Sequence, residues 1–314
     1  MRIVSLLPSA TEILFGLGFD KEIVGVSHEC DFPLRARTKI SVIHSRIPKG
    51  TAPGEIDRMV REYISRGESL YEVDEEILRD LAPDLIITQD LCHVCAASPH
   101  DLATALAKFK KRPKVLCLNP RDLRDIWRDI LWVGEETKRA VRAEEIVRMI
   151  GERIGELEII VGAIETRPRV VLLEWLQPFY VGGHWVPEMI KFAGGMDVLG
   201  KAEMPSCRVT EEKIIAAAPE VMIVAPCGYN KEQSRDEYLS LTFSPEWANI
   251  PAVRNGRVYA MDANSYVSRP GPRLVTGMEA MAKAIHPYVR MRPGAEAAVL
   301  PINRSTRNAQ IASA

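Results

Sequence analysis

Several features that would place a protein in a well-known class are missing from this sequence. No run of about 18 apolar residues occurs, so the sequence predicts no membrane span. The formal net charge is −1, which gives no electrostatic reason to expect nucleic acid or an anionic membrane as a partner. The 314 residues are therefore expected to form one large or two ordinary globular domains.

The common catalytic motifs are also missing. The sequence contains no GxSxG elbow, no Walker loop and no GxGxxG fingerprint. Gly182-Gly183-His184 is not a phosphate loop, because no strand, glycine-rich turn and lysine-bearing helix surround it. A Cys92 nucleophile with His28 or His184 as its base has no spacing that separates it from chance pairs. We therefore predict that the protein is not an enzyme.

The start of the chain does not have the pattern of a secretory signal peptide. Such a peptide needs a basic start, an apolar stretch and a small-residue cleavage site. Residues 2–7 instead have the pattern of a buried strand, and the segment after them that of a helix start. As written, the chain is expected to stay in the cytoplasm, and a periplasmic or extracellular location would require that its start has been trimmed.

Short apolar strands alternate with helices along both halves of the chain, which is typical of an α/β fold. Residues 2–7 predict a strand, the next ten a helix that ends at Gly18, and residues 23–26 a second strand. Later strands are predicted at 85–88, 114–118, 169–173, 221–224 and 257–261. The polar residues that follow such strands are candidates for ligand binding, because ligands of open α/β sheets bind at the carboxyl ends of the strands.

Residues 121–166 carry no strand signal and no proline, and their apolar residues recur at helical spacing. They predict one long helix, or two nearly collinear helices broken around Gly134. We therefore predict two Rossmann-like α/β lobes, at 1–120 and 167–288, joined by a long helix at 121–166. The ligand cleft is expected between the lobes. Residues 289–314 are predicted to form a loose C-terminal tail.

One pattern occurs in both halves. Residues 76–87 (EILRDLAPDLII) and 212–224 (EKIIAAAPEVMIV) each begin with a glutamate that stands seven residues before a proline, and a buried strand follows. Taken singly, Glu76 and Glu212 are explained by the helix dipole, which favours an acidic residue in the first turn. Their recurrence indicates that the two lobes share a structural plan.

Three segments point to a family. The opening RIVSLLPSATE (2–12), GVSHECDFP (25–33) and the repeated Glu–Pro–strand pattern resemble the substrate-binding proteins of cobalamin and iron-chelate ABC transporters, most closely the cobalamin-binding type. The resemblance implies a periplasmic binding protein fold and non-catalytic binding of a cobalamin-type corrinoid, with no intrinsic cofactor. It also implies that Glu76 and Glu212 dock into arginine pockets of an ABC permease, since charge-assisted Glu–Arg pairs give orientation as well as affinity.

A corrin ring is broad and flat and carries amides at its rim, so aromatic faces and arginine side chains suit it. Four aromatic residues cluster on one loop of the second lobe, and two further candidates follow the last strand, where the family places ligand contacts. We predict ligand contacts at Trp175, Phe179, Tyr180, Trp185, Tyr266 and Arg269. For Trp175 and Trp185, packing in the core beneath the loop is an equal alternative.

Cysteine and histidine residues also stand on the predicted loops. We predict that His28, Cys92, His93 and His184 line the ligand site, with an imidazole or a thiolate near the cobalt. Cys92 and Cys95 are also candidate metal ligands, because Cys and His are the usual ligands of zinc. The alternative is a buried free thiol, and the second ligand pair of a structural zinc site is missing.

Cys117 and three further histidines carry no pattern that points to a ligand site. Cys117 is predicted in a buried strand, and His44, His100 and His286 are predicted at the surface. The cysteines and histidines on the predicted loops leave two other functions open. One is a ferric-siderophore or haem binding protein, and the other is a cytoplasmic metal-dependent enzyme or metal handler that uses the Cys/His loops.

Overall fold

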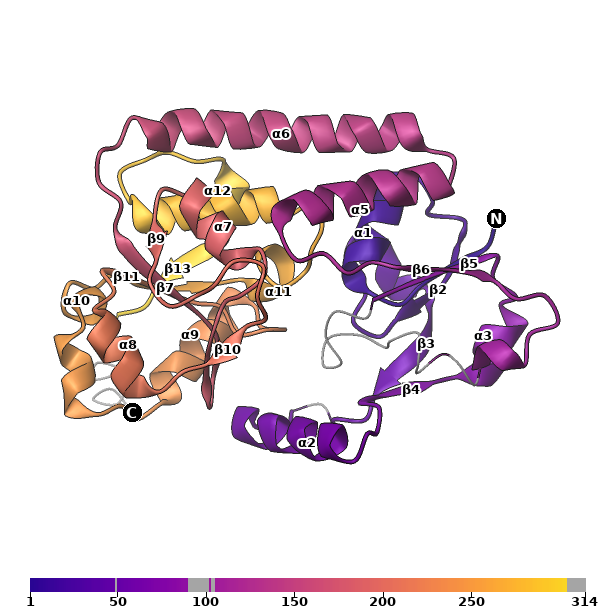
Figure 1. Cartoon of the computed structure of the whole chain (residues 1–314), viewed down its shortest axis with the longest axis horizontal. Helices are drawn as coiled ribbons and strands as arrows, with labels where there is room; N and C mark the ends of the chain where they lie inside the picture. Colours follow the sequence, from indigo (N-terminus) through magenta and orange to yellow (C-terminus); the bar gives the residue numbers. More distant parts are fainter. Residues whose placement is uncertain (49, 90–101, 103–104, 304–314) are drawn as a thin grey trace, which may run out of the picture. The chain divides into compact units, whose positions relative to one another are not determined.

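The computed structural model describes residues 1–48, 50–89, 102 and 105–303. The chain divides into two compact units, and each unit holds one β-sheet (Figure 1). The N-terminal unit comprises residues 1–120 and 124–148, and the C-terminal unit comprises 121–123 and 149–314. The two α/β lobes predicted from the sequence are therefore present.

The sheet of the N-terminal unit has the strand order β4-β3-β2-β1-β5-β6. Its strands are β1 (Ile3–Ser5), β2 (Ile23–Ser27), β3 (Ile40–Ser45), β4 (Tyr71–Val73), β5 (Leu85–Thr88) and β6 (Lys114–Cys117). All neighbours pair in parallel except β4, which is antiparallel to β3. The carboxyl ends of β3, β2, β1, β5 and β6 therefore lie at one edge of this sheet.

The helices of this unit lie between its strands or follow the last of them. They are α1 (Pro8–Gly16), the 3₁₀ helix η1 (Leu34–Thr38), α2 (Pro53–Ser65), α3 (Glu75–Asp80) and α5 (Leu123–Glu136), followed by α6 (Ala140–Gly162), which begins here and ends in the C-terminal unit. Proline at the first helical position opens α1 and α2, as its fixed φ favours.

The predicted long helix at 121–166 is in fact the two helices α5 and α6, and they are not collinear. A Cβ added at Gly134 of α5 would lie 2.3 Å from the Cβ of Ala143 in α6. Residues nine apart in one straight helix would be separated by roughly 13 Å along its axis, so the chain reverses between the helices. Lys138, in the connection, has a left-handed backbone with φ of 60°. Figure 1 shows the two helices one above the other.

The sheet of the C-terminal unit has the order β10-β8-β7-β11-β12-β13, and β9 also pairs with β7. Its strands are β7 (Arg169–Leu176), β8 (Phe179–Val181), β9 (Met196–Asp197), β10 (Cys207–Arg208), β11 (Val221–Val224), β12 (Val258–Met261) and β13 (Val299–Pro301). The strands β7, β11 and β12 are parallel, whereas β8 returns antiparallel to β7. This sheet is thus mixed, with a parallel centre.

The remaining helices belong to the C-terminal unit. They are α7 (Val186–Phe192), α8 (Glu211–Ala217), α9 (Lys231–Ser240), η2 (Pro245–Asn249), α10 (Pro251–Arg254), α11 (Ala263–Tyr266), α12 (Leu274–Ile285) and α13 (Pro293–Ala297). Buried residues of β7, β11 and β12 pack with Tyr238 and Trp247 in one hydrophobic core. The indole N–H of Trp247 donates to the Tyr238 hydroxyl at 3.0 Å, which satisfies the polar atoms of two buried rings.

The prediction of a loose tail from residue 289 was wrong for residues up to 303. Residues 293–297 form α13, and β13 pairs antiparallel with β12, where Ala260 lies opposite Leu300. The strand is only three residues long, and its proline shows why no strand pattern was visible in the sequence. Residues 304–314 lie outside the described part of the chain.

The prediction of a surface position for His286 was also wrong. Only 1% of this residue is exposed, and its Nε2 lies 3.2 Å from the carbonyl oxygen of Gly194. Burial lowers the pKa of the His286 imidazole, although the hydrogen bond to Gly194 works in the opposite direction. Gly194 has a φ of +82°, and a Cβ there would lie 2.7 Å from that Nε2. The histidine therefore packs against a turn that requires glycine.

Two helix glycines allow a matched test of the packing in the C-terminal unit. A Cβ at Gly277 of α12 would lie 2.0 Å from the backbone oxygen of Tyr266, whereas a Cβ at Gly151 of α6 meets nothing within 4 Å. We expect Gly277→Ala to lower the free energy of unfolding by about 1–3 kcal/mol. Gly151→Ala should raise it by up to about 1 kcal/mol, because alanine is the better helix former. Urea unfolding followed by circular dichroism measures both, and a Gly277→Ala protein as stable as the wild type would contradict this packing.

Candidate functional site

The carboxyl edge of the sheet in the N-terminal unit carries polar side chains. Ser5, Ser27, Thr88 and Gln89 end or follow β1, β2 and β5, and all four are buried. The Thr11 hydroxyl lies 2.8 Å from Oγ of Ser5 and belongs to the same group. Buried hydroxyls and amides at this edge match the location at which open α/β sheets bind ligands.

His28, a predicted site residue, lies at this edge directly after β2. It is half-buried, with Nδ1 3.0 Å from the Ile43 carbonyl oxygen and Nε2 3.2 Å from Oε1 of Glu29. Its ring centroid lies 6.4 Å from that of His44, nearly stacked, and 6.2 Å from that of Tyr71. Because β3 pairs with β2 on one side and β4 on the other, residues distant in sequence form one group of three rings.

This group of rings was not predicted from the sequence. His44 was predicted at the surface and is exposed, so that prediction is confirmed. Its position next to His28 depends on the pairing of β2 with β3, which no sequence pattern reports. The signal that could have found it is the segment Ile40-Ser41-Val42-Ile43, a short β-branched run that His44 directly follows.

Three predicted site residues, Cys92, His93 and Cys95, lie outside the described residues, as does His100. The proposed metal pair Cys92 and Cys95 therefore stays a prediction. Within the described part of the chain, no group of three or more His, Cys, Asp or Glu side chains could hold a metal ion.

The other cysteines have different surroundings. The thiol of Cys30 is buried, with its sulfur 3.1 Å from the Thr11 hydroxyl. Cys117 lies in β6 as predicted, but it is only half-buried. Cys207 and Cys227 are both exposed.

The C-terminal unit has a corresponding edge, formed by the carboxyl ends of the parallel strands β7, β11 and β12. Trp175, near the end of β7, is half-buried, and its indole N–H donates to the Gln177 carbonyl at 3.0 Å. Its ring meets that of Tyr229 edge-on, with centroids 6.0 Å apart. The backbone N–H of Asn264 in α11 donates to the Tyr229 carbonyl at 3.2 Å. The loops after the three strands are thus joined around Trp175 and Tyr229.

Tyr229 was not among the predicted residues. Its signal is its position five residues after β11, in the loop that follows a predicted strand. Burial raises the pKa of the Tyr229 hydroxyl, and the nearby Glu237 carboxylate raises it further. The phenol therefore stays protonated at neutral pH and can donate a hydrogen bond.

The adjacent residues Phe179 and Tyr180 of β8 face opposite sides of the sheet. Phe179 stacks on Trp247, with centroids 5.5 Å apart, and packs against the core. Phe179 thus packs against the core, and its predicted contact with a ligand stays a prediction. Tyr180 pairs across the ladder with Trp175 and is half-buried, so the two share a face.

His184 and Trp185 follow β8, and the antiparallel direction of β8 leads them away from the edge that holds Trp175. Only 7% of Trp185 is exposed, and its indole N–H donates to the Val267 carbonyl at 2.8 Å. The packing alternative therefore holds for Trp185. His184 is half-buried with φ of 49°, and burial, followed by the charge of Arg121, lowers the pKa of its imidazole.

Tyr266 and Arg269 lie in the segment after β12, as predicted. Tyr266 ends α11, and the Arg273 guanidinium carbon lies 5.7 Å from its ring centroid. Arg269 is only 8% exposed, so its charge is largely enclosed by the protein. Of the predicted residues of this unit, Trp175, Tyr180 and Tyr266 thus remain as half-buried aromatic candidates.

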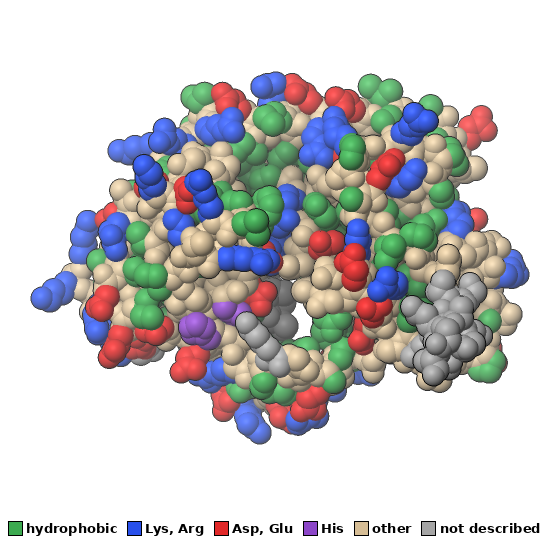
Figure 2. Space-filling model, turned by 180° about the vertical axis from the view of Figure 1, so that it is seen from behind, with side chains coloured by type: hydrophobic (Ala, Val, Ile, Leu, Met, Phe, Trp, Pro, Cys, Tyr) green, Lys and Arg blue, Asp and Glu red, His purple; other side chains and the backbone are tan. Residues whose placement is uncertain are grey.

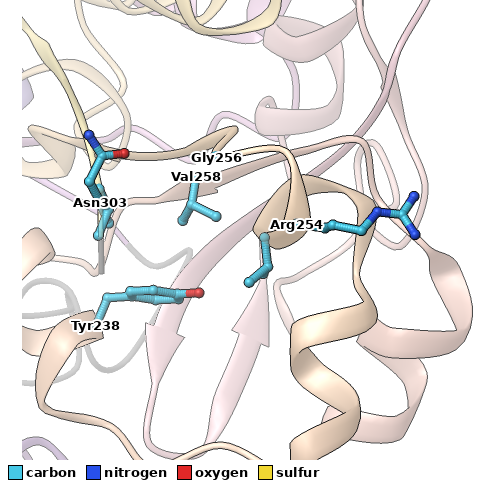
Figure 3. Close-up of a pocket in the computed structure, with 7 residues that line it drawn as sticks. Tyr238, Arg254, Gly256, Val258 and Asn303 are labelled. Carbon is cyan, nitrogen blue, oxygen red and sulfur yellow. The ribbon is translucent and has the colours of Figure 1, made fainter. Parts of the chain in front are cut away.

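A cavity of about 210 Å³ lies elsewhere in this unit (Figure 3). Its lining includes Tyr238, Arg254, Gly256, Val258 and Asn303. Gly256 precedes β12 and Val258 begins it, so the cavity lies at the amino end of that strand, opposite the edge with Trp175. As far as the structure describes the chain, its lining includes none of the predicted site residues.

Glu76 and Glu212 occupy the same position in two similar helices. Each is the second residue of its helix and is exposed. Oδ1 of Asp74 accepts from the Ile77 N–H at 2.9 Å before one glutamate, and the Thr210 hydroxyl accepts from the Lys213 N–H at 3.4 Å before the other. A hydrogen bond from the Thr210 hydroxyl lowers the pKa of Glu212.

The surface of each unit carries both signs of charge (Figure 2). In Figure 2, basic and acidic side chains lie interspersed on the visible face of each unit, as the net charge of −1 suggests. Of the helices in the described part of the chain, none is long and apolar enough to cross a membrane.

Residues 3–265 match the model of the periplasmic binding protein family. The chain belongs to this family. It is 24% identical to a vitamin B12-binding protein of Vibrio parahaemolyticus, over 88% of this chain and 86% of that one. It is also 24% identical to an uncharacterized ABC transporter substrate-binding lipoprotein of Bacillus subtilis, over 91% and 80% of the two chains.

Solved structures of other proteins have the same fold. A periplasmic heme-binding protein from Pseudomonas aeruginosa has a TM-score of 0.70 and 20% identity, covering 92% of this chain and 94% of that one. The periplasmic vitamin B12-binding protein of Vibrio cholerae has a TM-score of 0.66 and 20% identity, covering 90% and 96%. The predicted family and the predicted α/β fold class are thereby confirmed for this periplasmic binding protein.

Proposed function

We propose that this protein is the substrate-binding protein of an ABC transporter and that it captures a cobalamin-type corrinoid without changing it chemically. The observation that carries the proposal is the pair of half-buried rings, Trp175 and Tyr229, at the carboxyl edge of β7 and β11. Aromatic faces cover a broad, flat ring system well, and the Tyr229 hydroxyl can bond an amide at its rim. The similarity to vitamin B12-binding proteins supports the same ligand class.

Delivery to a permease forms the second part of the proposal. Glu76 and Glu212 are exposed on equivalent helices of the two units. In the described residues, the carboxylate of Glu76 makes no ion pair, whereas its neighbour Glu75 pairs with Lys108. An exposed carboxylate on a short, capped helix is suited to a charge-assisted contact with arginine. We therefore propose both glutamates as permease contacts.

Haem is a second candidate ligand, favoured by the rings of His28, His44 and Tyr71 at the edge of the N-terminal unit. Histidine and tyrosine are axial ligands of haem iron in proteins.

The absence of catalysis and the cytoplasmic location remain predictions. Cell fractionation tests the location, because a protein that loads a permease from outside has to reach its outer face.

The test is a titration of the purified protein with cyanocobalamin and, separately, with haemin. Saturable binding of cyanocobalamin with a dissociation constant of about 1 μM or below, seen as a shifted corrin spectrum, is the expected result. Saturation by haemin alone would select the second candidate. No uptake of cyanocobalamin at micromolar concentrations would contradict the corrinoid proposal.

The docking proposal has its own test. The double variant Glu76→Ala, Glu212→Ala should keep the wild-type affinity for cyanocobalamin and lose transport in cells that carry the cognate permease. The matched control is Glu75→Ala, which removes the neighbouring carboxylate paired with Lys108 and should leave transport unchanged. Weakened ligand binding in the double variant would contradict the assignment of these glutamates to docking.

A further inference from the structure

The two helices that carry Glu76 and Glu212 are held at their far ends by one arginine each. Nε of Arg2 donates to the carbonyl oxygen of Leu81 at 2.6 Å. Nη2 and Nε of Arg169 donate to the carbonyl oxygen of Ala217 at 2.7 and 3.2 Å. Leu81 and Ala217 each stand five residues after the exposed glutamate, so the contacts are equivalent in the two units.

The backbone hydrogen bonds around Arg2 and Arg169 are also equivalent in the two units. The N–H of Arg2 donates to Oδ2 of Asp84 at 2.9 Å, and the N–H of Arg169 donates to Oε2 of Glu220 at 2.8 Å. In return, the N–H groups of Asp84 and Glu220 donate to the arginine carbonyls, both at 2.8 Å. Each arginine is thereby fixed to the start of the strand that follows the helix.

The turn between helix and strand is the same in both units. Ala82 and Ala218 have left-handed backbones, with φ of 40° and 42°, and each precedes a proline. Alanine rarely adopts this conformation, because its Cβ then crowds the carbonyl oxygen. Contacts outside the turn have to hold it, and the arginine bonds to the residue just before each alanine are such contacts.

Helices α3 and α8 need this support because they are short. They contain six and seven residues, well below the length at which an isolated helix is stable. Each has a single buried side chain, Leu78 or Ile214. A cation at a helix C-terminus satisfies carbonyls that lack intrahelical partners and interacts favourably with the dipole. Each helix is anchored to the core by one buried side chain only. The arginine therefore fixes the position of the C-terminal end of the helix.

We propose that Arg2 and Arg169 are positioning residues for permease docking. Each fixes the orientation of one short helix on its own sheet, and so presents Glu76 or Glu212 in the same pose in each unit. This inference rests on the proposed docking function. It adds that docking depends on residues that do not touch the permease themselves.

A third arginine, Arg257, provides a control that distinguishes this positioning role from a general contribution to stability. Nη2 of Arg257 donates to the Ile285 carbonyl at 2.5 Å, at the C-terminus of α12. The chemistry is the same, but α12 carries neither docking glutamate. Arg257→Ala therefore removes an equivalent contact and serves as the matched control.

The experiment compares Arg2→Ala, Arg169→Ala with Arg257→Ala, each loaded with cyanocobalamin. The readouts are the affinity for cyanocobalamin and the half-saturating concentration for stimulating the ATPase of the cognate permease in proteoliposomes. We expect unchanged ligand affinity in the Arg2, Arg169 variant and a half-saturating concentration about ten-fold higher. Ten-fold corresponds to about 1.4 kcal/mol, the size of one charge-assisted hydrogen bond. Arg257→Ala should stimulate like the wild type.

A second variant and a second readout cover the case in which the alanine protein folds poorly. Arg2→Lys, Arg169→Lys keeps a cation that can reach one carbonyl and should restore most of the stimulation. Hydrogen exchange of the backbone amides in α3 and α8 should become faster in the alanine variant and return toward the wild-type rate in the lysine variant. Unchanged exchange in the alanine variant would overturn the inference without any use of the permease.

The outcomes separate this inference from the docking proposal. Wild-type stimulation by the Arg2, Arg169 variant would overturn the positioning role, and docking would stand if Glu76→Ala, Glu212→Ala still abolished stimulation. An equal loss in Arg257→Ala would also overturn it, because the effect would then be general destabilisation. Full stimulation by the double glutamate variant would refute the docking proposal itself.

Discussion

Trp175→Ala is expected to weaken the binding of cyanocobalamin by about ten- to hundred-fold, the loss that truncating a central aromatic contact of ~1.4–2.8 kcal/mol produces. The indole is half-buried at the carboxyl edge of β7, and its N–H is already used by the Gln177 carbonyl. The indole ring of Trp175 can therefore contact a ligand through its face and its edge, but not through its N–H. Removing it also leaves the ring of Tyr229 without the partner that orients it.

The affinity is measured from the corrin spectrum, with a parallel titration by calorimetry. Trp132→Ala is the matched control, because Trp132 is also half-buried but lies in α5, away from any strand end. Trp175→Phe should recover part of the affinity, since it keeps an aromatic face. A Trp175→Ala protein that binds cyanocobalamin like the wild type would remove the observation on which the corrinoid proposal depends.

Glu279→Ala is expected to lower the free energy of unfolding by roughly 3–5 kcal/mol, because it removes the shared partner of two arginines. Only 1% of Glu279 is exposed. Its oxygens accept from Nε and Nη2 of Arg153 at 3.1 and 2.7 Å and from Nη1 of Arg292 at 2.5 Å. These bonds tie α6 and the segment before α13 to α12, within the C-terminal unit. Without the carboxylate, Arg153 loses its ion pair with Glu279, and Arg292 keeps only its pair with the more exposed Glu156 among the ion pairs of the described residues.

Thermal and urea unfolding measure this loss. The control is Glu156→Ala, which removes the more exposed carboxylate paired with Arg292 at 2.5 Å. An exposed ion pair of this kind contributes about 0–1 kcal/mol. If Glu279→Ala cost no more than Glu156→Ala, the buried network would not stabilise the unit. An unchanged affinity for cyanocobalamin in Glu279→Ala would place the network in stability alone, apart from the ligand edge.

The candidate site could be predicted only in part. His28, Trp175 and Tyr266 were predicted because each lies at or after the carboxyl end of a strand that the sequence pattern indicates. Phe179 and Trp185 belong to the same loop in sequence, yet both pack inward. That difference depends on the reversal of β8 against β7 and on the register of the pair. Likewise, Tyr229 becomes a neighbour of Trp175 only because β11 pairs with β7.

By itself, the sequence determined the alternation of strands and helices, the duplication of the plan in two halves, and the equivalence of Glu76 with Glu212. These properties follow from local periodicity and from residues close in the chain. Only the tertiary structure decided that β13 joins the second sheet, that α5 and α6 are separate helices, and that Arg2 and Arg169 hold the helices that carry the glutamates. Those features are contacts between distant segments, and the register and direction of such contacts depend on how the whole core packs.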